Sequence, residues 1–252
     1  MEKWHGKIAV VTGASSGIGA ACCKALIDNG MIVVGLARRP ERIDEMRNLW
    51  PNDEEKQKRL HSRKCDVRQE SDIIEAFDYI AKEYGPVAVL INNAGIVRAT
   101  ELVRENNTED LRAILETNVM GMALCTREAF KTMSKNPAGL GHVINMNSVA
   151  GHKVLHFEGM STNMYPVSKF AVTAMTEVYR NEFLTHKTKL RVTSISPGVV
   201  RTEIFTPEDI KNMADFEFLE ASDIADAVIY CLQTPPHVQI HELTIKPVGE
   251  KF

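Results

Sequence analysis

Residues 7–19 read KIAVVTGASSGIG, and this stretch decides the fold class of the chain. It begins as a short apolar run, and apolar residues recur at helical spacing from Ile18 onward, so it predicts a strand, a tight turn and a helix. Glycines in the turn let the backbone approach a pyrophosphate, which the free N–H groups at the start of the helix bind. A glycine-rich turn without a ligand is the alternative. The residues expected to contact a dinucleotide here are Gly13, Ser15, Ser16, Gly17, Ile18 and Gly19.

Further short apolar runs follow at the spacing of strands that are separated by helices. They are Met31 to Ala37, Ser62 to Val67, Val87 to Asn92, His142 to Asn147, Arg191 to Ser196 and Gln239 to Ile245. Continuous apolar strands indicate burial on both faces, and their alternation with helices indicates a parallel sheet. We therefore expect one α/β domain over residues 1–252, a Rossmann-type doubly wound parallel sheet with helices on both faces. A helix is expected from about Pro40 to Leu49.

The composition argues against several other classes of protein. A net charge of −3 with scattered Lys and Arg provides no basic field for nucleic acid, so we expect no such partner. No apolar run reaches membrane-spanning length, and residues 1–6 lack the basic head and apolar centre of a secretory signal. The five cysteines have no metal-ligand spacing. We expect reduced thiols, no metal and a cytoplasmic protein.

Ligands of a doubly wound sheet bind outside the carboxyl ends of its strands. The second predicted strand ends in Ala37-Arg38-Arg39 and has no acid there to hold the ribose hydroxyls of NAD. A guanidinium can pair with a 2′-phosphate, so Arg38 and Arg39 favour NADP(H) as the cofactor. A solvated arginine pair at the start of a helix is the alternative.

Two further strand ends offer contacts to the same cofactor. Asp66 and Val67 close the third predicted strand, where Asp66 would accept a hydrogen bond from the adenine amine and Val67 would pack against the ring. An Asp that caps the next helix is the alternative. Asn93, Ala94 and Gly95 close the fourth, where small residues let the backbone run beside the cofactor. A purely structural turn would have the same composition.

Tyr165 and Lys169 are four residues apart, which places them on one helix face. A phenol titrates near pH ~10. The Lys169 ammonium, an oxidised nicotinamide and the helix N-terminus would each favour the phenolate, so Tyr165 is predicted to be an acid/base group. Ser148 would polarise a substrate oxygen, although Ser at a strand end is usually a turn residue. Asn118 falls inside a predicted helix, where Asn is disfavoured, and a water relay behind Lys169 is one reason for it.

From Lys7 to about Val248 the chain resembles the short-chain dehydrogenase/reductase family. The resemblance implies a tetrad in which Tyr165 is the acid/base and Ser148 orients the carbonyl. Lys169 would contact the ribose and the tyrosine.

Asn118 would complete this tetrad by holding a proton-relay water. The resemblance also implies that the turn after the sixth predicted strand covers the nicotinamide through Pro197, Gly198, Val200 and Thr202. There the Val200 backbone and the Thr202 hydroxyl would contact the carboxamide and the phosphates. Some NADP-dependent members carry a second basic residue where this chain has Ser16, so phosphate selectivity would rest on the arginine pair.

Within the family, residues 4–7, the arginine pair and the overall length resemble the insect NADP-dependent farnesol dehydrogenases and the vertebrate dehydrogenase/reductase member 11 group. This implies a terpenoid alcohol, a ketosteroid or another lipophilic carbonyl compound as substrate. A substrate-loop segment is expected at about residues 201–222, and apolar residues near Tyr165 and Thr202 would form a lid, although core packing would explain about half of them. They are Leu155, Phe157, Met160, Met164, Ile204, Phe205, Ile210, Met213, Phe216 and Phe218.

Two functions from different classes follow from these patterns. The leading hypothesis is an NADP(H)-dependent oxidoreductase that interconverts a lipophilic alcohol and its aldehyde or ketone, with Tyr165 as acid/base. The rival is a catalytically quiet nucleotide-binding regulatory protein on the same fold. Helices around Asn118 and Tyr165 carry apolar residues on more than one side, and in the family such helices pair between subunits, so we expect a homodimer or homotetramer.

Overall fold

Seven parallel strands form one sheet in the computed structural model, which describes residues 1–136, 139–154, 161–204 and 217–250. The spatial order is β3-β2-β1-β4-β5-β6-β7, so the chain winds outward from β1 to β3 and then outward again from β4 to β7. The expected doubly wound sheet is confirmed, with its switch point between β1 and β4. The strands are β1 (Ile8–Thr12), β2 (Ile32–Ala37), β3 (Leu60–Lys64), β4 (Val87–Asn92), β5 (His142–Met146), β6 (Arg191–Pro197) and β7 (Glu242–Ile245).

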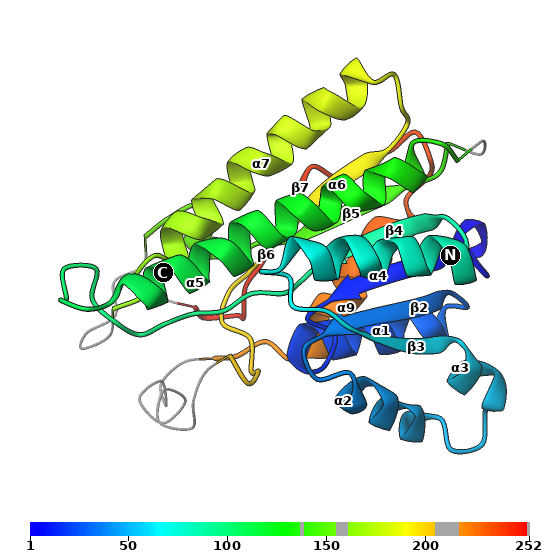
Figure 1. The fold of residues 1–252 in the computed structure, drawn as a ribbon, viewed down its shortest axis with the longest axis horizontal. Coiled ribbons are helices and arrows are strands. Elements are labelled where there is room, and N and C mark those ends of the chain that lie inside the picture. The colour runs from blue at the N-terminus through cyan, green and yellow to red at the C-terminus, as the bar shows by residue number, and fades with distance from the viewer. Residues whose placement is uncertain (137–138, 155–160, 205–216, 251–252) are drawn as a thin grey trace.

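Helices cover both faces of the sheet (Figure 1). α1 (Gly17–Asp28) and α9 (Ala221–Gln233) pack together on one face, and α4 (Glu70–Glu83), α6 (Met122–Met133) and α7 (Tyr165–Thr185) cover the other. The short elements are α2 (Glu41–Asp44), α3 (Glu54–Lys58), α5 (Thr108–Leu115), a π-helical turn (Glu116–Gly121) and 3-10 turns at Glu2–Trp4, Glu45–Leu49 and Val149–Gly151.

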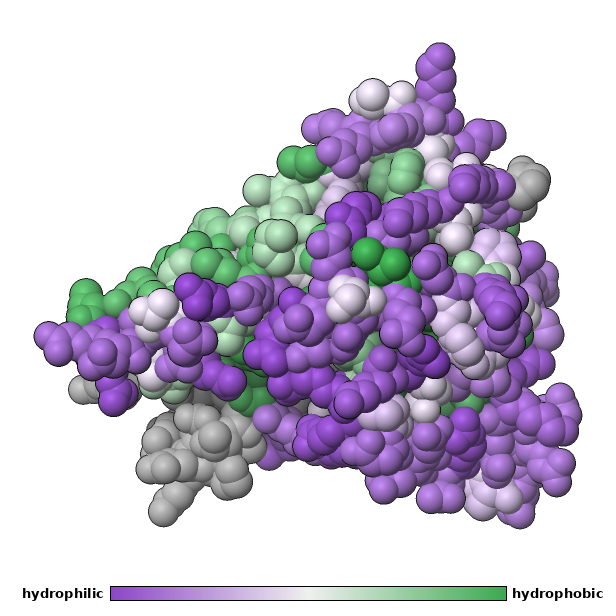
Figure 2. All heavy atoms as spheres, viewed as in Figure 1, coloured by the Kyte–Doolittle hydropathy of each residue, from purple (hydrophilic) through white to green (hydrophobic). Residues whose placement is uncertain are grey.

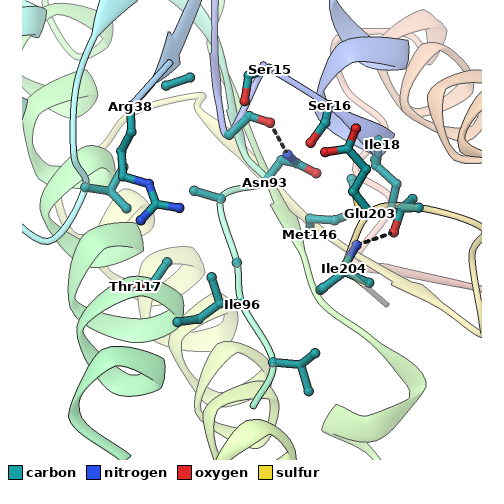
Figure 3. A pocket seen from close by; sticks show the side chains of 18 of the residues that line it. Ser15, Ser16, Ile18, Arg38, Asn93, Ile96, Thr117, Met146, Glu203 and Ile204 are labelled. Carbon is teal, nitrogen blue, oxygen red and sulfur yellow. Dashed lines mark hydrogen bonds between the residues drawn. The ribbon is translucent and has the colours of Figure 1, made fainter. Parts of the chain in front are cut away.

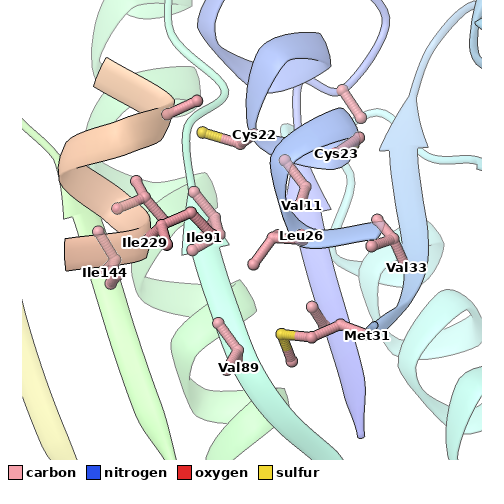
Figure 4. Close-up of a cluster of buried hydrophobic side chains, with 14 of the residues drawn as sticks. Val11, Cys22, Cys23, Leu26, Met31, Val33, Val89, Ile91, Ile144 and Ile229 are labelled. Atoms are coloured by element: carbon pink, nitrogen blue, oxygen red, sulfur yellow. The ribbon is translucent and has the colours of Figure 1, made fainter. Parts of the chain in front are cut away.

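The larger core lies between the sheet and the α1–α9 pair (Figure 4). Val11 and Ile91 from neighbouring strands meet Leu26 of α1 there, and Ile229 of α9 closes the same cluster. Trp4 is fully buried beside it and donates a hydrogen bond from Nε1 to the Leu232 carbonyl at 2.8 Å. Burial of these side chains holds the carboxyl ends of the central strands at one edge of the sheet.

Three predicted elements have clearly wrong boundaries, and one of them is β7, which begins at Glu242 and not at Gln239. β3 runs from Leu60 to Lys64, earlier than the apolar run that predicted it, because it is an edge strand whose exposed side chains are polar and leave a weak apolar pattern. The predicted helix from Pro40 to Leu49 is α2 followed by a 3-10 turn, in which the Arg47 guanidinium donates to the Leu60 carbonyl at 2.8 Å.

No helix in the part of the chain that the structure describes is long and apolar enough to cross a bilayer.

Candidate functional site

A cleft of about 350 Å³ runs along the carboxyl edge of the sheet (Figure 3). It extends from Arg38 at the end of β2, past the glycine turn, to Ile204 beyond β6. Most of the predicted site residues line it: Gly13, Ser15, Ser16, Gly17, Ile18, Arg38, Arg39, Asp66, Val67, Asn93, Ala94, Gly95, Tyr165, Lys169 and Thr202. The others lie behind or beside this lining: Gly19, Asn118, Ser148, Pro197, Gly198 and Val200.

The glycine turn is built so that only glycine fits. Gly13 and Gly17 have positive φ values of 64° and 53°, which side chains rarely adopt. A Cβ on Gly19 would lie 2.3 Å from the Gly13 carbonyl oxygen. Ser16 is the N-cap of α1, yet its side chain makes no capping hydrogen bond, so the first N–H groups of the helix face the cleft unshielded. This is the geometry that binds a phosphate anion.

The ends of β1 and β4 are joined by hydrogen bonds at the switch point. Thr12 Oγ1 accepts from the backbone N–H groups of Asn93 and Ala94, each at 3.0 Å. The Asn93 side chain returns hydrogen bonds from Nδ2 to the carbonyls of Thr12 (3.0 Å) and Gly13 (3.2 Å). The predicted Asn-Asn-Ala-Gly turn therefore forms the floor of the cleft and supports the glycine turn.

Arg38 and Arg39 stand exposed at the end of β2, and Figure 3 shows the Arg38 guanidinium directed into the cleft. Within the described residues, neither guanidinium forms an ion pair with a carboxylate, whereas most other arginines of the chain do. Two guanidinium groups that form no direct ion pair among the described residues are available at this strand end to the 2′-phosphate of NADP(H).

Asp66 and Val67 lie just past β3, not inside it as predicted. The Asp66 carboxylate is paired with Arg68, with Nε–Oδ1 at 3.0 Å and Nη2–Oδ2 at 2.6 Å, and this pairing is the first cause that lowers the pKa of Asp66. Its side chain does not cap α4, whose N-cap is Gln69. Arg68 thereby becomes a wall of the cleft that the sequence did not single out.

Tyr165, Lys169 and Ser148 meet where α7 begins. Lys169 Nζ lies 5.5 Å from the centre of the Tyr165 ring and donates to the Met146 carbonyl at 2.8 Å. The Tyr165 hydroxyl is hydrogen-bonded with Ser148, whose Oγ also accepts from Ala150 N–H at 3.1 Å. Residues from β5, the turn after it and α7 thus bring a phenol, an ammonium and a hydroxyl together.

Burial dominates the electrostatics of these groups. It raises the pKa of the Tyr165 phenol, and the hydrogen bond with Ser148 opposes that shift. Burial also lowers the pKa of the Lys169 ammonium to about 8. The expected stabilisation of the phenolate by Lys169 is therefore not found in the chain alone, because desolvation disfavours the charged forms of both residues.

Asn118 lies in the π-helical turn between α5 and α6, and its side chain is almost fully used. Oδ1 accepts from Ile96 N–H at 2.9 Å, while Nδ2 donates to the Ile96 carbonyl and to Ser168 Oγ, each at 3.0 Å. Ser168 Oγ donates in turn to the Tyr165 carbonyl at 2.7 Å. Asn118 thus ties the loop after β4 to the first turn of α7. Both of its amide hydrogens are used in these bonds, so neither can be donated to a water.

The turn after β6 folds back toward the glycine turn. A Cβ on Gly17 would lie 3.1 Å from Thr202 Cβ, so Thr202 packs directly over the glycine turn. Gly198 N–H donates to the Ile245 carbonyl at 2.7 Å, and Val200 forms a parallel bridge with Leu219. Thr202 therefore reaches the cleft, whereas Gly198 and Val200 support the turn from the side of β7 and α9.

Several residues of the site were missed in the sequence. Asn163 is buried, has a left-handed φ of 51°, accepts from Met164 N–H at 2.6 Å and hydrogen-bonds to Thr100 through Nδ2. The sequence signal that could have found Asn163 is its place shortly before Pro166, which lies at the start of a helix, because Asn tolerates the left-handed conformation. The missed residues that line the cleft are Leu36, Ala37, Cys65, Arg68, Ile96, Val97, Arg98, Thr117, Met146, Asn147 and Glu203.

Much of the predicted apolar lid lies outside the described residues, since Leu155, Phe157, Met160 and residues 205–216 fall there. Ile204 does line the cleft. Among described residues, no three His, Cys, Asp or Glu side chains gather as a metal site. All five cysteines are buried free thiols, and burial raises the pKa of each.

Comparison with known proteins agrees with this geometry. The family model described as short chain dehydrogenase matches residues 7–212. The chain is 53% identical to a farnesol dehydrogenase of Aedes aegypti over the full length of both chains. It is 40% identical to dehydrogenase/reductase SDR family member 11 of Gallus gallus, over 99% of each chain. The closed form of a serine dehydrogenase complexed with NADP+ superposes with a TM-score of 0.84 at 28% identity, covering 97% of this chain and 96% of that one.

Asn163→Gly is expected to lower the free energy of unfolding by about 1–3 kcal/mol. Glycine keeps the left-handed backbone, so the loss reports the two side-chain hydrogen bonds, worth roughly 0.5–1.5 kcal/mol each. Asn163→Ala should lose about 1–2 kcal/mol more through strain at that φ. Urea unfolding measures both variants. Asn106→Gly, at an exposed left-handed position, is the control and should not lose stability; equal stability of Asn163→Ala and wild type would contradict the assignment.

Proposed function

The chain belongs to the short-chain dehydrogenase/reductase family of oxidoreductases, and we propose that it is an NADP(H)-dependent enzyme interconverting a lipophilic alcohol and its aldehyde or ketone. The observation that carries this proposal is the convergence of Tyr165, Lys169 and Ser148 at one end of a cleft. The other end of that cleft holds the glycine turn and the guanidinium of Arg38, which forms no ion pair with a described residue. A proton-transfer group and a dinucleotide cradle thus share one cavity.

The cofactor assignment rests on the charge and shape of the cleft. The α1 N-terminus and glycine turn suit the pyrophosphate, and Arg38 with Arg39 suits the 2′-phosphate. Val67 would pack against the adenine, and Gly95 would let the backbone run beside the cofactor. When bound, nicotinamide supplies the position that accepts or returns a hydride.

In this mechanism Tyr165 takes the hydroxyl proton of the alcohol during oxidation and returns a proton to the carbonyl oxygen during reduction. Ser148, already hydrogen-bonded with Tyr165, holds the reacting oxygen beside the phenol. Since burial raises the pKa of Tyr165 in the chain alone, where Lys169 is already present, the phenolate needs a further positive charge, which oxidised nicotinamide would provide.

Lys169 and Asn118 act on the position of these groups. Lys169 is fixed by its bond to the Met146 carbonyl and would contact the cofactor ribose. A relay water at Asn118 could only donate to it, because both amide hydrogens are used within the chain. Thr202 would contact the phosphates and the carboxamide, with Pro197, Gly198 and Val200 shaping the turn beneath it.

The proposed substrate is a terpenoid alcohol such as farnesol, or a ketosteroid or similar lipophilic carbonyl compound. The name of the Aedes relative, a farnesol dehydrogenase, supports the terpenoid alcohol. Four apolar side chains that line the cleft with Tyr165 support a lipophilic substrate, namely Ile96, Val97, Met146 and Ile204. A single domain with a substrate loop at about 201–222 completes the proposal, although residues 205–216 of that loop lie outside the described part. Free buried thiols support a cytoplasmic location.

Tyr165→Phe is expected to lower kcat by at least 100-fold, because general acid–base catalysis contributes about 10²–10⁴-fold. Cofactor affinity should stay within about twofold of wild type, since the ring remains in place. Turnover and NADPH binding by fluorescence measure the two effects. Tyr179→Phe, a change of the same size on the same helix outside the cleft, is the matched control. Wild-type turnover by Tyr165→Phe would contradict the mechanism, and tight cofactor binding without turnover in the wild type would favour the regulatory alternative.

Farnesol, geraniol, a hydroxysteroid and a short secondary alcohol, each with NADP+ and NAD+, test the cofactor and substrate assignments together. We expect kcat/KM to be at least about tenfold higher with NADP+ because Arg38 and Arg39 pair with the 2′-phosphate. The long apolar alcohols should exceed the short one through burial of their chains. Equal efficiency with both cofactors would contradict the arginine assignment, and a preference for the short alcohol would contradict the lipophilic site.

We further propose that two copies associate through α7. Val167, Phe170, Ala174 and Val178 repeat at helical spacing and are exposed, and Met120 of the neighbouring π-helical turn is 54% exposed. Figure 2 shows apolar side chains gathered along the side of the molecule that α7 forms. An exposed apolar stripe of this kind is typical of a subunit interface.

Val178→Glu is expected to convert the oligomer to a monomer, because a carboxylate would be buried in that interface without a partner. Leu184→Glu is the matched control, since Leu184 is 69% exposed on the same helix but off the stripe, and it should leave the mass unchanged. Light scattering after size exclusion measures the mass. A wild-type monomer, or an oligomer unaffected by Val178→Glu, would exclude this interface.

A further inference from the structure

An ion pair joins two segments that are far apart in the sequence, and one of its two residues, Glu203, lines the cleft. Arg42 of α2 and Glu203, just after the β6 turn, pair through the two terminal guanidinium nitrogens and both carboxylate oxygens, with Nη1–Oε2 at 2.8 Å. In the sheet, three strands (β1, β4 and β5) separate β2, which leads into α2, from β6. The pair therefore connects the two sides of the carboxyl edge.

The position of Glu203 places this connection over the cofactor cleft. Glu203 lines the cleft and follows Thr202, which packs over Gly17. Figure 3 shows the Glu203 side chain near Ser16 and Ile18 of the glycine turn. A dinucleotide held by the glycine turn and by Arg38 would pass beneath the segment that Arg42 holds.

The charge of Glu203 gives the pair a second consequence. A free carboxylate in a phosphate-binding cleft would repel the cofactor. Arg39 and Glu203 line the same cleft, and the charge of Arg39 contributes, after that of Arg42, to lowering the pKa of Glu203. Without Arg42, the Glu203 carboxylate would thus pair with Arg39. Arg39 is one of the two residues assigned to the 2′-phosphate.

We propose that the Arg42–Glu203 pair is a clasp that slows cofactor dissociation and keeps Glu203 from competing with the 2′-phosphate for Arg39. The inference rests on the proposed NADP(H) function. Both side chains are partly exposed, at 31% and 57%, so the pair adds little to folding stability, and its effect is on cofactor binding.

The two single variants are expected to differ. Glu203→Gln opens the clasp and removes the competing charge, so NADPH should dissociate about 2- to 5-fold faster, as expected for a pair worth up to ~1 kcal/mol, with an unchanged preference for NADPH over NADH. Arg42→Ala opens the clasp but leaves the carboxylate, so dissociation should accelerate similarly and the preference for NADPH should fall several-fold. Adding Glu203→Gln to Arg42→Ala should restore the preference.

Stopped-flow displacement gives the dissociation rates, and fluorescence titration gives Kd for NADPH and NADH. Glu75→Gln is the matched control, because it removes the Arg63–Glu75 ion pair of 2.6 Å outside the cleft, and it should behave as wild type. Thermal melting confirms that each variant is folded.

Wild-type dissociation rates in both Arg42→Ala and Glu203→Gln would overturn the clasp. An NADPH preference in Arg42→Ala equal to that in Glu203→Gln would overturn the competition for Arg39. A wild type that prefers NADH would overturn both the proposed cofactor and the competition for Arg39. In that case the NADH dissociation rates of the wild type and the two single variants would still test the clasp. Binding of neither cofactor would overturn both proposals.

Discussion

The hydrogen bonds between the ends of β1 and β4 are the constraint on which the site depends. Thr12 Oγ1 accepts two backbone N–H groups from the turn after β4, and Asn93 returns its amide hydrogens to the carbonyls of Thr12 and Gly13. At this switch point the chain leaves the sheet in opposite directions, so a crevice opens there. These bonds form the floor of the crevice, and the polar groups in it are already hydrogen-bonded to one another. They also hold Gly13 where Gly19 can pack against it.

A second set of hydrogen bonds connects the loop after β4 to the end of the cleft that holds Tyr165. Asn118 binds the loop after β4 on one side and Ser168 on the other, and Ser168 binds the Tyr165 carbonyl. The π-helical turn around Asn118 gives its side chain a place between these partners. Such turns are irregular and appear often at functional sites. The position of the Tyr165 phenol is therefore coupled to the cofactor side of the cleft.

Sequence patterns predicted most of the sheet because its central strands are buried on both faces. β4 occupies the predicted residues 87–92, and β1, β2, β5 and β6 differ from their apolar runs only at the ends. The prediction failed at β3, where one edge of the strand is solvated and the pattern weakens. Of the site, the glycine turn, Arg38, Tyr165 and Lys169 could be found from spacing, because each depends on residues close together in the chain.

Two of the residues that were missed act through partners far away in sequence. Asn163 contacts Thr100, 63 residues away, and Glu203 pairs with Arg42, 161 residues away, so no local pattern marks either contact. The spacing of Tyr165 and Lys169 in the sequence also did not determine the pKa of Tyr165. Four residues separate it from Lys169 in the chain, but burial decides how both groups titrate.

The amino-acid sequence by itself determined the doubly wound sheet, the glycine turn and the candidate acid/base pair, because periodicity and short spacing act within single elements. Only the tertiary structure decided that Asn118 is bound to Ile96 and Ser168, and that Glu203 is held by Arg42. These choices depend on distance and burial between segments that only the folded sheet brings together.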